Sequence, residues 1–253
     1  MNVKRLSLLS LVAVAVLGSI GAAQAATMNY RHEFVPESGQ HKDRVAFSHR
    51  LKNGVGFGVE AKWKNTKADS GVSYWDMFDN VTPDGSVFTV NYQYKINNDW
   101  SLQPGVQLDG RDYQIYTRAT YSITKDFSAS LRYRWRMTND NTVKSKQSTS
   151  DKKHRDNWTF NLGYKLTPAI TLGYELDFNS LDNSHYNSKT DSYTGFNGQD
   201  RTWEHNLSAG YKINKEWEPF VEFGWIQYKD GTASHAGTNT YVPRYRFGLK
   251  YNF

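Results

Sequence analysis

The 253-residue sequence contains no cysteine, and beyond its first twenty residues it contains no long hydrophobic run. The absence of cysteine excludes a disulfide framework, which stabilises many small exported domains. The absence of a second hydrophobic run excludes a membrane-spanning helix in the rest of the chain, because such a helix needs about 20 apolar residues. Overall hydrophobicity is also low, and the mean hydropathy of −0.74 by itself favours a soluble or partly disordered chain.

Aromatic residues are abundant, however, and they argue against disorder. They make up 15% of the chain, with 17 Tyr, 13 Phe and 8 Trp, whereas disordered chains are poor in aromatics. Strong polarity combined with many aromatics is typical of a membrane β-barrel, in which one face of each strand contacts lipid and the other faces water. Such a barrel is stabilised by its closed ladder of backbone hydrogen bonds.

The N-terminus has the three parts of a secretory signal. Lys4 and Arg5 form a positive segment, residues 6–20 are apolar, and Ala23-Gln24-Ala25 is a cleavage site of the A-x-A type. The apolar run is too short for a stable membrane span, which disfavours the alternative of a membrane anchor. We therefore predict a signal peptide over 1–25 and a single barrel domain over 26–253. Without Lys4 and Arg5 the chain has 29 basic and 25 acidic residues, a net charge of +4.

A turn phrase recurs five times: an apolar residue, three polar or turn-forming residues, and a second apolar residue. It reads Leu51-Lys52-Asn53-Gly54-Val55, Ile96-Asn97-Asn98-Asp99-Trp100, Ile123-Thr124-Lys125-Asp126-Phe127, Leu166-Thr167-Pro168-Ala169-Ile170 and Ile213-Asn214-Lys215-Glu216-Trp217. Alternating apolar and polar residues flank each phrase, so we expect five tight hairpins. With the first and last strands added, the strand count is twelve.

Polar connections lie between these hairpins, at roughly 35–41, 65–85, 138–157, 179–202 and 229–243, with a short one near 109–112. Short periplasmic turns at one end and long extracellular loops at the other are typical of outer-membrane barrels, which have an even number of strands. We therefore predict an all-β fold, a transmembrane antiparallel β-barrel of about 12 strands in the outer membrane of a Gram-negative bacterium.

Side-chain alternation predicts which face of each strand points inward. In the strand that begins at Phe127, apolar residues occupy every second position as far as Met137, and Arg132, Arg134 and Arg136 share the other face. The last strand ends on Phe253 with apolar or aromatic residues at alternate positions. It resembles the terminal strand that outer-membrane proteins present to the barrel-assembly machinery, which we expect as a partner.

The predicted inward positions carry twice as many basic as acidic residues. The basic residues that we expect to line a pore and bind substrate are Arg31, Lys42, Arg44, Arg50, Lys62, Lys95, Arg118, Arg132, Arg134, Arg136, Lys165, Arg244, Arg246 and Lys250. Lys64 and Lys212 bring the inward basic total to sixteen. The eight inward acidic residues are Glu33, Glu60, Asp109, Glu175, Asp177, Glu204, Glu218 and Glu222.

A basic, water-filled interior selects anions, because it lowers the energy of an anion and raises that of a cation. Arg132, Arg134 and Arg136 are spaced about 7 Å apart along one face of a strand. Each guanidinium can bind a carboxylate through paired hydrogen bonds, so this ladder suits a polyanion with repeated carboxylates. The alternative is that the basic residues pair with the inward acidic residues and plug a narrow barrel.

Several phrases resemble the oligogalacturonate-specific porin (KdgM) family. They are Asn29-Tyr30-Arg31-His32-Glu33, His41-Lys42-Asp43-Arg44, Ser48-His49-Arg50, Glu60-Ala61-Lys62-Trp63, Gln103-Pro104-Gly105, Leu131-Arg132-Tyr133-Arg134, Gly173-Tyr174-Glu175 and Tyr245-Arg246-Phe247-Gly248. The resemblance spans the mature chain. It implies a monomeric twelve-stranded barrel that admits acidic oligosaccharides from pectin through a basic pore. A sialic-acid channel belongs to the same family, so another acidic sugar is the alternative substrate.

The rival from another class is an outer-membrane barrel hydrolase, for which His32, His49 and His205 are candidate bases. Such an enzyme needs a nucleophile hydrogen-bonded to a histidine. Ser48 and His49 are neighbours in a strand and therefore point to opposite faces. No G-x-S-x-G or H-E-x-x-H phrase is present. We therefore expect a passive channel rather than an enzyme, without metal or cofactor, whose partners are membrane lipid and an acidic oligosaccharide and not nucleic acid.

Overall fold

The computed structural model describes residues 26–65, 81–110, 112–139, 152–188, 192–193, 196, 198–227 and 240–253. The predicted signal peptide and much of the long connections lie outside these residues. The strands of the barrel are β1 (Thr27–Val35), β2 (Gln40–Arg50), β3 (Val55–Asn65), β4 (Val81–Tyr92), β5 (Tyr94–Lys95), β6 (Trp100–Asp109), β7 (Asp112–Ser122), β8 (Phe127–Asn139), β9 (Lys152–Lys165), β10 (Ile170–Leu181), β13 (Arg201–Tyr211), β14 (Trp217–Gln227) and β15 (Tyr241–Asn252).

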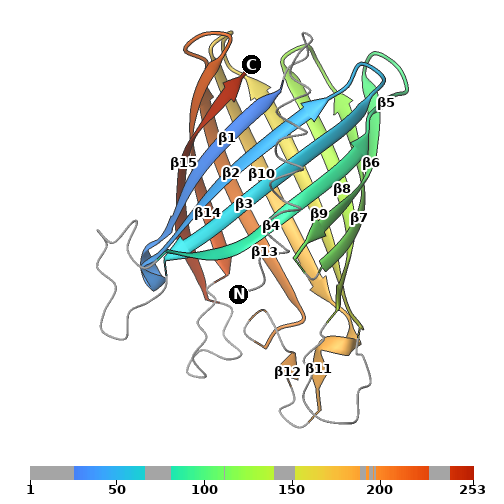
Figure 1. The fold of residues 1–253 in the computed structure, drawn as a ribbon, viewed down its shortest axis with the longest axis vertical. Helices are drawn as coiled ribbons and strands as arrows, with labels where there is room; N and C mark the ends of the chain where they lie inside the picture. The colour runs from blue at the N-terminus through green and yellow to red at the C-terminus, as the bar shows by residue number, and fades with distance from the viewer. Residues whose placement is uncertain are drawn as a thin grey trace, which may run out of the picture.

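All strand pairs in this sheet are antiparallel, and the sheet closes on itself (Figure 1). β1 pairs with β2 on one side and with β15 on the other, while β4 pairs with β3 and β6. The two-residue β5 continues β4, so the barrel has twelve strands, as the turn phrases predict. The break between β4 and β5 falls at Gln93, near Pro104 of β6. Proline has no backbone N–H to donate, and this interrupts the ladder locally.

The five predicted hairpins are confirmed, and each connects consecutive strands of the barrel. The second residue of four of these turns, such as Asn97 or Thr167, explains why the phrase recurs. Its side-chain oxygen accepts hydrogen bonds from the two backbone amides that follow at positions +2 and +3, at distances of 2.7 to 3.2 Å. Such local bonds favour a tight turn over continued strand. Figure 1 shows these turns gathered at the end of the barrel where the chain ends.

The strands run further towards the opposite end than the sequence predicts. Residues 81–85 and 152–157, expected in loops, belong to β4 and β9, and the predicted connection at 35–41 is only the short 3-10 turn η1 (Pro36–Ser38) with Gly39. The predicted strand ends follow the apolar stripe, whereas the backbone ladder does not require apolar side chains beyond the hydrocarbon region. The β10–β13 connection contains η2 (Asn183–His185) and a small hairpin of β11 (Tyr186–Asn187) and β12 (Ser192–Tyr193).

Much of the outward face of the barrel is apolar and exposed. Leu207 and Val221 are each 58% exposed, and Ile115 is 57% exposed. Such exposure is unfavourable in water but suits the hydrocarbon layer of a membrane. Of the residues described, none forms a helix long and apolar enough to cross a membrane.

Gly248 of β15 is required by close packing inside the barrel. A Cβ atom at this position would overlap the backbone oxygen of Tyr30 and lie 2.5 Å from the ring of Phe220. Because the Tyr30 backbone cannot rotate away, Gly248→Ala is expected to lower the free energy of unfolding by about 1–3 kcal/mol. Gly58→Ala is the control, since the nearest atoms lie 3.7 Å from its added Cβ. Urea unfolding in lipid vesicles measures both variants, and equal stabilities would contradict the prediction.

Candidate functional site

The strand register gathers the predicted basic residues in rows around the barrel interior. Directly paired residues on neighbouring strands share a face of the sheet. One row joins Arg31, Arg44 and Lys62 on β1, β2 and β3. Another joins Arg118 of β7 to Arg132 of β8. The barrel therefore brings together basic residues that are far apart in the sequence.

The first and last strands carry an ion-pair network. Arg246 of β15 is bound on both sides, with its guanidinium 2.7 Å from Glu33 of β1 and 2.5 Å from Glu222 of β14. Arg244 lies 3.4 Å from Glu204 and within 3.9 Å of the same two carboxylates. These side chains are nearly buried, and only 12% of Arg246 is exposed. Arg244 and Arg246 are therefore neutralised by neighbouring acids.

Other predicted basic residues are also paired with acids. Arg44 lies 3.2 Å from Glu60, Lys62 3.2 Å from Asp109, Lys64 2.7 Å from Asp84 and Lys250 2.7 Å from Glu218, and Arg136 pairs with Asp112. Asp84 and Asp112 are additional to the eight predicted inward acids; Asp84 falls in a segment expected to be a loop. In total, seven of the sixteen predicted residues form ion pairs. For these seven residues the structure agrees with the alternative in which inward basic residues pair with acidic ones.

Five interior arginines away from the short turns have no carboxylate of the described residues within 4.0 Å, and we call them the unpaired arginines: Arg31, Arg118, Arg132, Arg134 and Arg155. Arg132 and Arg134 instead donate to neutral groups, at 2.7 Å to Thr159 and 3.1 Å to Gln114. The guanidinium of Arg155 lies 4.9 Å from the centre of the Phe196 ring. These five guanidinium groups are thus not held directly by a carboxylate of the described residues, although Asp177 is near enough to act on the charges of Arg132 and Arg134.

The remaining predicted residues lie apart from this group. Arg50 donates to Gly54 and Asn91 beside the first short turn, at 2.7 and 2.8 Å. Lys165 donates to the backbone oxygen of Lys125 at 3.3 Å, also at a turn. Lys95 and Lys212 lie next to short turns as well, and Lys42 is opposite Glu33 in the register.

Two adjoining interior cavities, of about 480 and 330 Å³, share Arg31, Arg132, Arg134, Arg136 and Glu175 in their linings. Arg31 belongs to β1 and Arg132 to β8, on opposite sides of the barrel order. The two residues therefore face each other across the interior. Seven arginines and three acidic residues line the smaller cavity, so its walls carry a positive excess.

A model of the oligogalacturonate-specific porin (KdgM) family matches residues 19–253 of the chain. The chain belongs to this porin family. The oligogalacturonate-specific porin KdgM of Dickeya dadantii (strain 3937) is 33% identical over 260 residues, which cover 100% of both chains. The N-acetylneuraminic acid outer membrane channel protein NanC of Escherichia coli (strain K12) is 24% identical over 98% of this chain and 99% of its own. A structure of KdgM porin in complex with disordered oligogalacturonate has a TM-score of 0.59 and 28% identity, over 90% of this chain and 99% of that chain.

Membership of a porin family, together with the closed barrel, places the chain in the outer membrane with its apolar face against lipid. The hydrolase alternative also lacks a suitable site at His32. Its Nδ1 lies 2.9 Å from Asp43, and its Nε2 lies 3.1 Å from the Nδ1 of His41. Both ring nitrogens thus meet a carboxylate or another histidine, not a nucleophilic hydroxyl. Within the described part of the chain, no group of three acidic or histidine residues could hold a metal ion.

Besides Asp84 and Asp112, two further interior residues of this porin are missing from the sequence prediction. Arg155 falls where a loop is expected, although it has the same parity as Asn157 and Thr159 on β9. Extending the alternation backwards from Thr159 by four residues would have identified it. Phe220 lies on the same inward face of β14 as Glu218 and Glu222, but it is uncharged and is therefore not among the predicted inward charges.

Proposed function

We propose that this porin is a passive channel for acidic oligosaccharides, with oligogalacturonates from pectin as its substrate. The observation that carries the proposal is the set of unpaired arginines on β8 and β9, Arg132, Arg134 and Arg155, that line the interior cavities together with Arg31. The 33% identical relative is named as an oligogalacturonate-specific porin. No catalytic step or cofactor is part of the proposal.

The unpaired arginines matter more for selectivity than the paired ones. A guanidinium held between two carboxylates contributes little net field, whereas an uncompensated one lowers the energy of an entering anion. Arg132 and Arg134 are about 7 Å apart on one face of β8. Their forked donors suit successive carboxylates of an extended polyuronate. We assign the unpaired arginines to the substrate path, namely Arg31, Arg118, Arg132, Arg134 and Arg155. The ion-paired basic residues belong to the barrel wall around this path.

The size of the barrel supports a chain-like substrate. Eight strands leave an interior filled by side chains, and sixteen leave a wide channel. Twelve strands with cavities of a few hundred cubic ångströms suit an extended oligosaccharide better than a globular solute. We further propose that the porin acts as a monomer, that residues 1–25 direct its export, and that the strand ending at Phe253 is presented to the barrel-assembly machinery.

Single-channel recording in planar bilayers tests this function. The reversal potential in a salt gradient should show anion selectivity, and trigalacturonate should interrupt the current with resolved blocking events. N-acetylneuraminate at the same concentration should block for a shorter time, because it carries one carboxylate instead of three. Cation selectivity, or the absence of any block, would overturn the channel proposal. Preferential block by N-acetylneuraminate would favour a sialic-acid channel instead, in line with the name of the 24% identical relative.

A further inference from the structure

Phe220 places an aromatic ring on the inward face of β14, between Glu218 and Glu222. Its register neighbours are both glycines, Gly210 of β13 and Gly248 of β15. Gly248 in turn pairs with Arg31 of β1. The ring and the Arg31 guanidinium are therefore in the same interior row, separated by a residue without a side chain.

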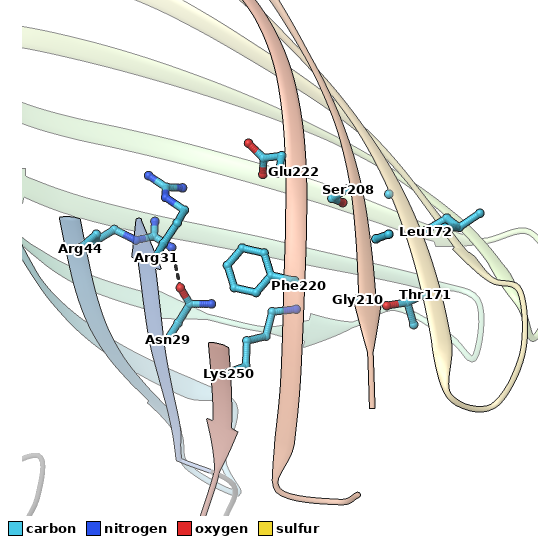
Figure 2. Close-up of a pocket in the computed structure, with 12 residues that line it drawn as sticks. Asn29, Arg31, Arg44, Thr171, Leu172, Ser208, Gly210, Phe220, Glu222 and Lys250 are labelled. Carbon is cyan, nitrogen blue, oxygen red and sulfur yellow. Dashed lines mark hydrogen bonds between the residues drawn. The ribbon is translucent and has the colours of Figure 1, made fainter. Parts of the chain in front are cut away.

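The ring packs on the wall of the barrel and remains partly exposed. Two of its atoms lie 2.5 and 2.6 Å from where a Cβ of Gly248 would be, so the glycine makes room for it. Figure 2 shows the ring projecting from β14 towards Arg31 and Asn29, with Lys250 beside it. The Lys250 Nζ is 5.5 Å from the ring centre. Together these residues line an interior cavity of about 250 Å³.

A second aromatic side chain that packs over a glycine differs from Phe220 in its exposure. Tyr116 of β7 packs over Gly105 of β6, with ring atoms within 2.7 Å of the position of a Cβ. Only 7% of Tyr116 is exposed, so its ring fills space in the wall. Covering a strand glycine with an aromatic is a known stabilising device, and it accounts for Tyr116. It does not account for a ring such as that of Phe220, which lines a cavity and is flanked by cations.

We propose that Phe220 is a stacking residue for the sugar rings of the substrate, a subsite that rests on the function proposed above. A pyranose presents a flat face of C–H groups, which is apolar, and a uronic acid carries its carboxylate at the edge of that ring. The face packs on the Phe220 ring, and the carboxylate binds Arg31, which has no carboxylate of the described residues within 4.0 Å. Aromatic and apolar surface with a few placed polar groups is the usual composition of a small-molecule site.

The experiment compares two polyanions in single-channel recording. Trigalacturonate has both carboxylates and sugar rings, whereas tripolyphosphate has charge alone, so the ratio of their blocking times isolates ring stacking. Phe220→Leu should lower this ratio roughly threefold to tenfold, the size expected for loss of one aromatic contact. Phe220→Tyr keeps the flat ring and should stay within about twofold of the wild type. Tyr116→Leu is the matched control and should not change the ratio.

The possible outcomes separate the two proposals. If the wild type is blocked by neither polyanion, the channel function fails. If trigalacturonate blocks the wild type but the ratio is the same in Phe220→Leu, the stacking subsite alone is refuted. An equal fall in Tyr116→Leu would also refute it, because the effect would then follow from wall packing. Should Phe220→Leu fail to assemble, Phe220→Met replaces it with an unbranched apolar side chain, and the same fall in the ratio is expected.

Discussion

Replacing Arg132 and Arg134 together by glutamine is expected to remove most of the anion selectivity of the channel and to shorten its block by trigalacturonate at least tenfold. Both arginines lie on the same face of β8, and neither forms an ion pair with a described carboxylate. A hydrogen bond to a charged group is worth about 1.5–3 kcal/mol, so the loss of even one corresponds to roughly a tenfold change in binding. Glutamine keeps a donor for Thr159 or Gln114, which should preserve the wall.

The control for this double variant removes the same charge elsewhere. Lys125 and Lys215 are in short turns outside the barrel wall, and both can be replaced by glutamine. The reversal potential and the blocking time should then remain close to the wild type. If the two double variants behave alike, selectivity follows the total charge of the protein and the assignment of Arg132 and Arg134 is wrong. Arg136 is left intact because Asp112 already neutralises it.

Arg246→Met is expected to destabilise the barrel strongly. The change removes the guanidinium that lies 2.7 and 2.5 Å from Glu33 and Glu222, and leaves them only the more distant Arg244 at 3.9 Å. Removing one partner from a buried ion pair typically costs about 3–5 kcal/mol, because the remaining charge is uncompensated. Urea unfolding in lipid vesicles, followed by the gel mobility of unheated samples, measures the loss.

A compensated variant distinguishes lost charge balance from lost packing. When Glu33→Gln and Glu222→Gln accompany Arg246→Met, no carboxylate is left unpaired at this position, and most of the stability should return. A single Arg246→Met variant as stable as the wild type would show that the network contributes little. Equal instability of the single and triple variants would point to packing of the Arg246 stem instead.

The sequence contains the local information for this fold. Turn phrases such as Ile96-Asn97-Asn98-Asp99-Trp100 can be recognised because a single Asn side chain closes the turn. The inward face of β8 can be predicted because alternation has a strict period of two residues. Where the apolar stripe ends, the signal ends too, so the extension of β9 over 152–157 and its Arg155 are missed.

The pairing of charges could not be predicted in the same way. Glu33 and Arg246 are 213 positions apart in the sequence and meet only because β1 pairs with β15. Which arginines are neutralised therefore depends on the register of strands that close the barrel, and no local periodicity contains it. Counting inward charges predicted a two-to-one excess of basic over acidic residues but not where the acids pair, whereas the structure has ion-paired arginines on β15 and unpaired arginines on β7 to β9.

The position of Arg246 also affects how the barrel closes. Before the C-terminal strand arrives, the two edges that it must join, β14 and β1, each present a carboxylate, Glu222 and Glu33. Those like charges oppose direct contact between the edges. Insertion of the last strand places the Arg246 guanidinium between the two carboxylates, so electrostatic attraction on both sides stabilises the closed barrel. Arg246 belongs to the last strand to be synthesised, and a chain truncated before this strand would leave two edges with like-charged carboxylates and no guanidinium between them.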